Sequence, residues 1–202
     1  DVVLVGINAD TEGAFPEPIA LWHRYFAQLL HALAKARPRA VGIDVVPPDH
    51  SFNAIMPGID LAMMRGMLDL KRVAPLVYTQ TVNPRGELMP VQQNFRGILA
   101  PENLGVDQQL RDPDGVSRAF SESKLSRSDE PVPTFAGQIL RHLGITVGEG
   151  YIDYSLGAPL EYLPMQGVVG WDEQQLAKAF AGRVVLVGWA TRERDRWPLP
   201  AR

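Results

Sequence analysis

Three stretches of the chain are apolar at almost every position and lack the alternation of a strand that has one face in water. They are Val2–Ile7 (VVLVGI), Arg39–Pro48 (RAVGIDVVPP) and Arg183–Gly188 (RVVLVG). Strands of a parallel sheet that is covered on both faces have this pattern. The sequence therefore predicts an α/β fold with a mostly parallel central sheet flanked by helices, in which Arg39–Pro48 is a central strand.

The segment between the first two of these strands changes to a helical period. Apolar residues recur at i, i+3 and i+4 spacings from Ile19 until Pro38, which cannot continue a helix; they are Trp22, Phe26, Leu29, Leu30 and Leu33. A strand, this helix and a second strand form a β-α-β unit, whose crossover is right-handed. We expect the two strands to be parallel neighbours in the sheet.

Strand and helix patterns continue to alternate along the chain. We expect Asp60 to cap a helix with Leu61, Met64 and Leu68 on one face, followed by a strand at Pro75–Val82. Further on, the patterns predict a helix over Thr134–Leu143, a short strand at Ile152–Ser155 and a helix between Asp172 and Gly182.

The middle of the chain contains a strong turn signal. Asn103–Leu110 and Val116–Leu125 flank Asp112-Pro113-Asp114-Gly115, in which proline and glycine are placed for a tight turn. We therefore predict an added β-hairpin around residues 103–125.

Composition limits the class of protein. With 202 residues, 46% of them hydrophobic, the chain can bury a full core as a single domain. The net charge of −3 and the lack of a Lys/Arg cluster argue against nucleic acid as a partner. The absence of cysteine excludes disulfides and thiolate metal sites, and no apolar run approaches the length of a membrane span.

Several catalytic and metal motifs can be tested against the sequence. Asn8-x-Asp10-Thr11 after the first strand imitates the D-x-D-x-T loop of haloacid-dehalogenase phosphotransferases, but an amide at the nucleophile position cannot form an aspartyl phosphate. The chain has no G-x-G-x-x-G, P-loop, G-x-S-x-G or paired-histidine zinc spacing. A calcium loop around Gly115 fails, because Leu110 and Ser121 occupy its first and twelfth positions.

Polar side chains do collect where the predicted parallel strands end. They are Asn8 and Asp10, Asp44, and Thr191 with Asp195. Open α/β sheets bind ligands at the carboxyl ends of their strands, so we expect these side chains to converge on one rim and bind a small polar ligand. The alternative is that Asp44 only accepts hydrogen bonds from backbone amides of the neighbouring loop.

The order of several short motifs resembles the type-two CHASE domain, a sensory module of bacterial receptors. The matching stretches are VVLVGI and its polar loop, FPEP before the first helix, VGID at Val41–Asp44, LGVD followed by DPDGVSR within Leu104–Arg118, TFAGQIL, IDY at Ile152–Tyr154, and FAGRVVLVG followed by Asp195, Pro198 and Pro200. The resemblance covers nearly the whole chain. Asn8 departs from it, because the family usually carries aspartate there, and an amide has no charge to offer a ligand.

The resemblance implies a periplasmic or extracellular sensor domain, cut from a longer membrane receptor. A membrane helix would precede Asp1, and further helices after Arg202 would lead to a cytoplasmic kinase, cyclase or similar output. It implies a homodimeric receptor with an unidentified ligand, and neither catalytic residues nor a cofactor. Two alternatives stay open: an α/β enzyme acting on phosphorylated small molecules, and a sensor that binds another envelope protein through the apolar loop Phe52–Pro57.

Overall fold

A computed structural model describes residues 1–83, 85, 87–107, 110–125, 130–155 and 160–190. Its centre is a six-stranded sheet in the order β4-β3-β2-β10-β1-β9. The strands are β1 (Val2–Ile7), β2 (Ala40–Asp44), β3 (Leu76–Gln80), β4 (Leu104–Val106), β9 (Glu161–Pro164) and β10 (Val184–Trp189). Every neighbouring pair is parallel, which confirms the predicted α/β class and its parallel central sheet.

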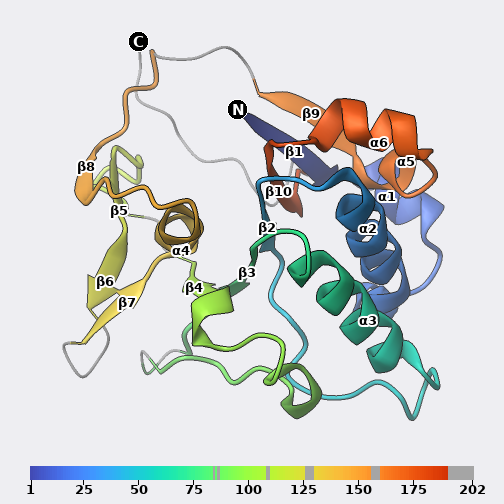
Figure 1. The fold of residues 1–202 in the computed structure, drawn as a ribbon. Helices are drawn as coiled ribbons and strands as arrows, with labels where there is room; N and C mark the ends of the chain where they lie inside the picture. Colours follow the sequence, from blue (N-terminus) through green and yellow to red (C-terminus); the bar gives the residue numbers. More distant parts are fainter. Residues whose placement is uncertain (84, 86, 108–109, 126–129, 156–159, 191–202) are drawn as a thin grey trace.

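Helices cover the two faces of this sheet unequally (Figure 1). On one face lie α2 (His23–Ala36), α3 (Ile59–Lys71), α6 (Glu173–Phe180) and the short α1 (Ala9–Ala14) and α5 (Met165–Val168). On the other face α4 (Phe135–His142) packs on β2, β3 and β4. Single 3₁₀ turns occur at Ile19–Leu21, Gln93–Phe95 and Pro101–Asn103.

The alternation of side chains along the strands divides the core into two parts. Val41, Ile43 and Val187 belong to the larger cluster under α2, α3 and α6, whereas Ala40 and Val184 belong to a smaller cluster under α4. Because successive strand residues point to opposite faces, both clusters require apolar residues at nearly every strand position. This is why the strands have continuous apolar sequences instead of alternating ones.

The prediction that the first two strands are neighbours is wrong. The last strand, β10, lies between β1 and β2 and pairs with both, so Gly188 is opposite Gly6 on one side and Asp44 on the other. The three strands have nearly identical apolar patterns, and these patterns do not specify which strands become neighbours. The crossover through α2 therefore skips one strand position.

Two predictions about helices also need correction. The polar segment after β1 is not a loop, because Asn8 caps α1, which begins at Ala9. The cap of α3 is Gly58, and the predicted apolar face is turned outwards, with Leu61 and Leu68 exposed. The buried face of α3 instead consists of Ile59, Asp60, Met63, Gly66, Met67 and Leu70.

The region of the predicted hairpin forms small antiparallel sheets with other partners. The tight turn is present, because the Gly115 amide donates to the Asp112 carbonyl at 2.8 Å. However, the segment before the turn joins the central sheet as β4, beside β3. After the turn, β5 (Ala119–Ser121) pairs with β8 (Glu149–Tyr151) and β6 (Ser123–Leu125) pairs with β7 (Pro131–Pro133). The short strand expected at 152–155 lies earlier, as β8.

The predicted ends of α4 and α6 agree with the structure. Thr134 caps α4 by accepting a hydrogen bond from the Gly137 amide, and Asp172 caps α6 in the same way through Gln175. Gly144 and Gly182 follow these helices with φ of 69° and 68°, a conformation that glycine adopts at little cost. None of the helices described is long and apolar enough to cross a membrane.

A buried polar cluster lies where α2 meets α3. His23 and Asp60 are 5% and 1% exposed, and the His23 Nδ1 is 3.9 Å from the Asp60 Oδ1. Ser51 Oγ and Gln92 Nε2 each donate to Asp60 Oδ2 at 2.6 Å. These hydrogen bonds explain why α3 buries the face that carries Asp60 and not the predicted face of Leu61, Met64 and Leu68.

The burial of His23 predicts a loss of stability in weak acid. Burial lowers its pKa below 6.5, while the Asp60 carboxylate acts in the opposite direction. The folded state therefore binds this proton less readily than the unfolded state, so the stabilisation is complete above about pH 6.5 and is lost as the pH falls towards the folded pKa. We expect the unfolding temperature to decrease between about pH 7.5 and 5.5, and to decrease less in His23→Gln.

His31→Gln is the matched control, because His31 is on the same helix with a side chain 43% exposed. It should retain the wild-type pH dependence in a thermal unfolding series. An equal decrease in wild type and His23→Gln would show that other groups cause the effect.

Candidate ligand-binding site

Asp44 is the last residue of β2 and the first exposed residue of a strand that is otherwise buried. Alternation puts its side chain on the face of the sheet that carries α4, because Gly42 on this face is covered by Phe135 and Ile139. Next to Asp44 lies Gly188, where an added Cβ would be 3.4 Å from the Asp44 Cβ. The strand beside Asp44 thus presents backbone instead of a side chain, which leaves space at this edge.

A cavity of about 350 Å³ opens beside Asp44. Its walls come from β2, the end of β4, the segment after the tight turn, the start of α4 and the segment after β8. The lining residues are Asp44, Val106, Asp107, Leu110, Ser117, Ala119, Phe120, Ser121, Thr134, Phe135, Ala136, Ile152 and Tyr154. Five separate parts of the chain therefore meet beside Asp44.

The hydroxyl groups in this cavity mainly hold its walls together. The Tyr154 hydroxyl donates to the Ser117 carbonyl at 2.7 Å, and Thr134 Oγ1 donates to the Ser121 carbonyl at 2.8 Å. Ser121 Oγ donates to the Ser123 carbonyl at 2.6 Å. These bonds position the surrounding segments and commit the hydroxyl protons to backbone acceptors.

The charged side chains among the described lining residues of this cavity are both acidic. Asp44 and Asp107 are both exposed, and none of the described residues that line the cavity is basic. Arg118 follows the lining residue Ser117, but its guanidinium pairs with Asp112 and Asp114 at 2.6 and 2.8 Å. The hydrogen bonds from Arg118 lower the pKa of Asp114 to about 2, so this pair stays ionised at any ordinary pH.

A smaller cavity of about 190 Å³ lies on the other side of Asp44. It shares Asp44 and Phe135 with the larger one, and its further lining residues are Leu4, Val5, Gly6, Tyr162, Leu186, Val187, Gly188, Trp189 and Ala190. The ring of Tyr162 lies directly over Gly6, where an added Cβ would be 2.1 Å from its Cε2. Partial burial raises the pKa of Tyr162, and a hydrogen bond with Asn8 acts in the opposite direction.

The residues expected at the rim are brought together only in part. Asp44 lines both cavities, and Asn8 reaches the smaller one through Tyr162. Asn8 is also occupied as a cap, since its Oδ1 accepts from the Thr11 amide at 3.0 Å. Asp10 is exposed in the first turn of α1 and lines neither cavity, and Thr191 and Asp195 lie outside the described residues.

Sequence reasoning missed Asp107, Tyr154 and Tyr162. Asp107 follows β4, so it reaches the rim only because β4 is a parallel strand of the central sheet and not half of a hairpin. Its position after a short apolar strand is the same signal that identified Asp44. Within the described residues, no group of three or more His, Asp or Glu side chains is arranged to hold a metal ion.

Comparison with known proteins agrees with the resemblance seen in the motifs. The family model described as the CHASE2 domain matches residues 1–202, the whole chain. No curated protein and no solved structure matches the chain.

Proposed function

Since the chain belongs to the CHASE2 family, whose members are sensory domains found in receptors, we propose that it is the extracytoplasmic signal-sensing domain of a bacterial transmembrane receptor. The receptor would be a homodimer with a cytoplasmic kinase or cyclase as its output. The observation that supports sensing of a small molecule is the acidic cavity at Asp44, which lies at the carboxyl edge of a parallel sheet.

The chemistry of this cavity favours a ligand with an amine or several hydroxyl groups. Two carboxylates, Asp44 and Asp107, accept hydrogen bonds and attract positive charge, and no basic side chain among the described lining residues opposes them. The volume of about 350 Å³ lies within the range of small-molecule sites.

The construction of the cavity also suggests how binding becomes a signal. One wall belongs to the central sheet and α4, and a second wall contains Ser117, Phe120 and Tyr154 from the segments around β5 and β8. A ligand that contacts both walls binds best when they are close together. Such a difference in affinity between two arrangements is the requirement for shifting a receptor between two states.

The location of the domain can be tested by labelling with a maleimide that does not cross membranes. The chain contains no cysteine, so one cysteine can be added at exposed Ala54 in the full-length receptor. We expect Ala54→Cys to react in intact cells, measured against the receptor without the added cysteine.

Ala27→Cys is the control for folding, because Ala27 is 3% exposed and should react only after denaturation. Reaction of Ala54→Cys only after the membrane is permeabilised would place the domain in the cytoplasm and refute the proposal.

A further inference from the structure

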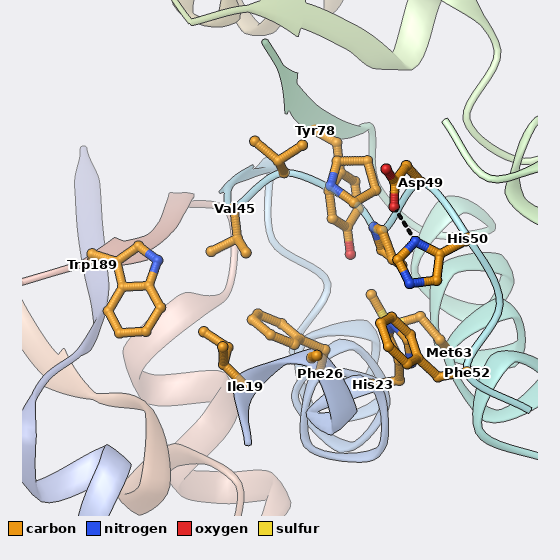
Figure 2. A pocket seen from close by; sticks show the side chains of 14 residues that line it. Ile19, His23, Phe26, Val45, Asp49, His50, Phe52, Met63, Tyr78 and Trp189 are labelled. Carbon is orange, nitrogen blue, oxygen red and sulfur yellow. Dashed lines mark hydrogen bonds and ion pairs between the residues drawn. The ribbon is translucent and has the colours of Figure 1, made fainter. Parts of the chain in front are cut away.

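Figure 2 shows a third cavity, of about 430 Å³. It opens at the same edge of the sheet as the other two, but on the face that α2 and α3 cover. It lies between the start of α2 and the segment after β2. Its lining residues are Ile19, Ala20, His23, Phe26, Val45, Val46, Pro47, Pro48, Asp49, His50, Phe52, Met63, Tyr78 and Trp189. It shares no residue with the 350 Å³ cavity around Asp44.

The walls of this cavity are largely apolar, but two of its lining side chains carry buried polar atoms. Tyr78 is 1% exposed, and its hydroxyl has no hydrogen-bond partner among the described residues. Figure 2 shows this hydroxyl pointing into the space above Phe26 and His23. His23 is 5% exposed, and its Nδ1 also lacks a hydrogen bond in the described part of the chain.

A buried tyrosine hydroxyl without a hydrogen bond is unfavourable, so we expect a hydrogen-bond acceptor beside it. Buried polar atoms are almost always hydrogen-bonded, and a tyrosine hydroxyl inside a protein usually finds an acceptor. Water is a poor candidate, because an ordered water needs several polar contacts and this cavity is mainly lined by carbon. Phenylalanine would fill the same position of β3 without an unpaired group.

The same surroundings define the chemistry of the partner. Burial raises the pKa of Tyr78, so the hydroxyl keeps its proton and donates a hydrogen bond. Burial lowers the pKa of His23, which is therefore neutral, and the Asp60 carboxylate behind it disfavours an anion. Asp49 and His50 also line the cavity, but their side chains are exposed and paired with each other. A charged group beside Tyr78 would therefore lose its hydration without an unpaired opposite charge to replace it.

We propose that this cavity binds a small neutral molecule with an apolar body and a carbonyl-type acceptor that takes the hydrogen bond of Tyr78. The site is separate from the acidic cavity at Asp44. Its volume is within the range of small-ligand sites, and aromatic or branched aliphatic bodies fit its walls of Phe26, Val45 and Met63.

The test uses two probes of almost the same shape, acetophenone and α-methylstyrene, which differ by a carbonyl oxygen against a methylene group. Calorimetric titration of the 202-residue chain should show binding of acetophenone, and Tyr78→Phe should weaken it about tenfold. α-Methylstyrene should bind wild type and Tyr78→Phe equally. No binding of acetophenone to the wild type, or equal affinity for both proteins, would overturn the proposal.

The stability of the variant is a second readout. Tyr78→Phe removes a buried hydroxyl that has no partner, so the variant should unfold at a temperature no lower than that of the wild type. A clearly lower unfolding temperature would mean that the hydroxyl is already bonded within the protein, and would refute the site.

Blocking the mouth of the cavity provides an independent check. Val46 lines the cavity and is 44% exposed, so Val46→Trp should fold and close the entrance. This variant should lose binding of both probes. Leu68→Trp is the control, because Leu68 is 42% exposed on α3 and does not line the cavity. Retained binding in Val46→Trp, or equal loss in Leu68→Trp, would contradict this location.

Discussion

Gly137→Ala is expected to reduce the free energy of unfolding by about 2–3 kcal/mol, because the position has no room for a side chain. An added Cβ would lie 2.0 Å from the backbone oxygen of Glu122. That backbone cannot easily move, since Glu122 accepts from the Thr134 amide at 2.9 Å and donates to the Gly148 carbonyl at 2.8 Å. The helix α4 would have to shift away from the segment between β5 and β6, and urea denaturation measures the cost.

Gly13→Ala is the matched control for this change. Gly13 also lies in a helix, and no atom lies within 4 Å of the position of its added Cβ. Alanine is the better helix former, so this variant should equal or slightly exceed the stability of the wild type. If the two variants unfold at the same urea concentration, close packing of α4 against the Glu122 backbone is not a source of stability.

Asp44→Asn is expected to weaken binding of the sensed ligand roughly tenfold to a hundredfold, the usual contribution of a hydrogen bond to a charged group. The change keeps the shape of the side chain and removes its charge. Asp44 is exposed at the end of β2, so the fold should be unaffected. A thermal-shift screen of amines and polyols on the wild type would supply the ligand, and calorimetry would measure its affinity.

Asp49→Asn is the control for the loss of an acidic group at the same edge of the sheet. Asp49 lines the apolar cavity on the opposite face and is paired with His50. The variant should bind the amine or polyol as well as the wild type does. Equal weakening by Asp49→Asn, or unchanged affinity in Asp44→Asn, would contradict a specific site at Asp44.

The acidic cavity at Asp44 and the apolar cavity lie at the carboxyl edge of the same sheet, and Trp189 connects their surroundings. Trp189 is the last residue of β10 and lines both the apolar cavity and the smaller cavity next to Asp44. The ligand-binding rim predicted from the sequence therefore stays a prediction, and at this edge the sheet separates an acidic cavity from an apolar one. Sequence reasoning expected one polar site there.

Local chemistry determined much of this protein without help from tertiary structure. Continuous apolar runs specified β1, β2 and β10, and Pro38 with the caps at Thr134 and Asp172 specified helix ends. The end of β2 at Asp44 agrees with Pro47 and Pro48, because proline cannot continue a central strand. These features depend on neighbours in the chain, so the sequence contains them directly.

Tertiary structure decided what depends on distant partners. The sequence alone determined that three apolar strands exist, but packing decided that β10 lies between β1 and β2, because nearly identical patterns can be paired in any order. The buried face of α3 is the one that carries Asp60, because the fold brings Ser51 and Gln92 within hydrogen-bond distance of its carboxylate. The cavities also depend on tertiary structure, since a cavity is the space that separate segments of the chain leave between them.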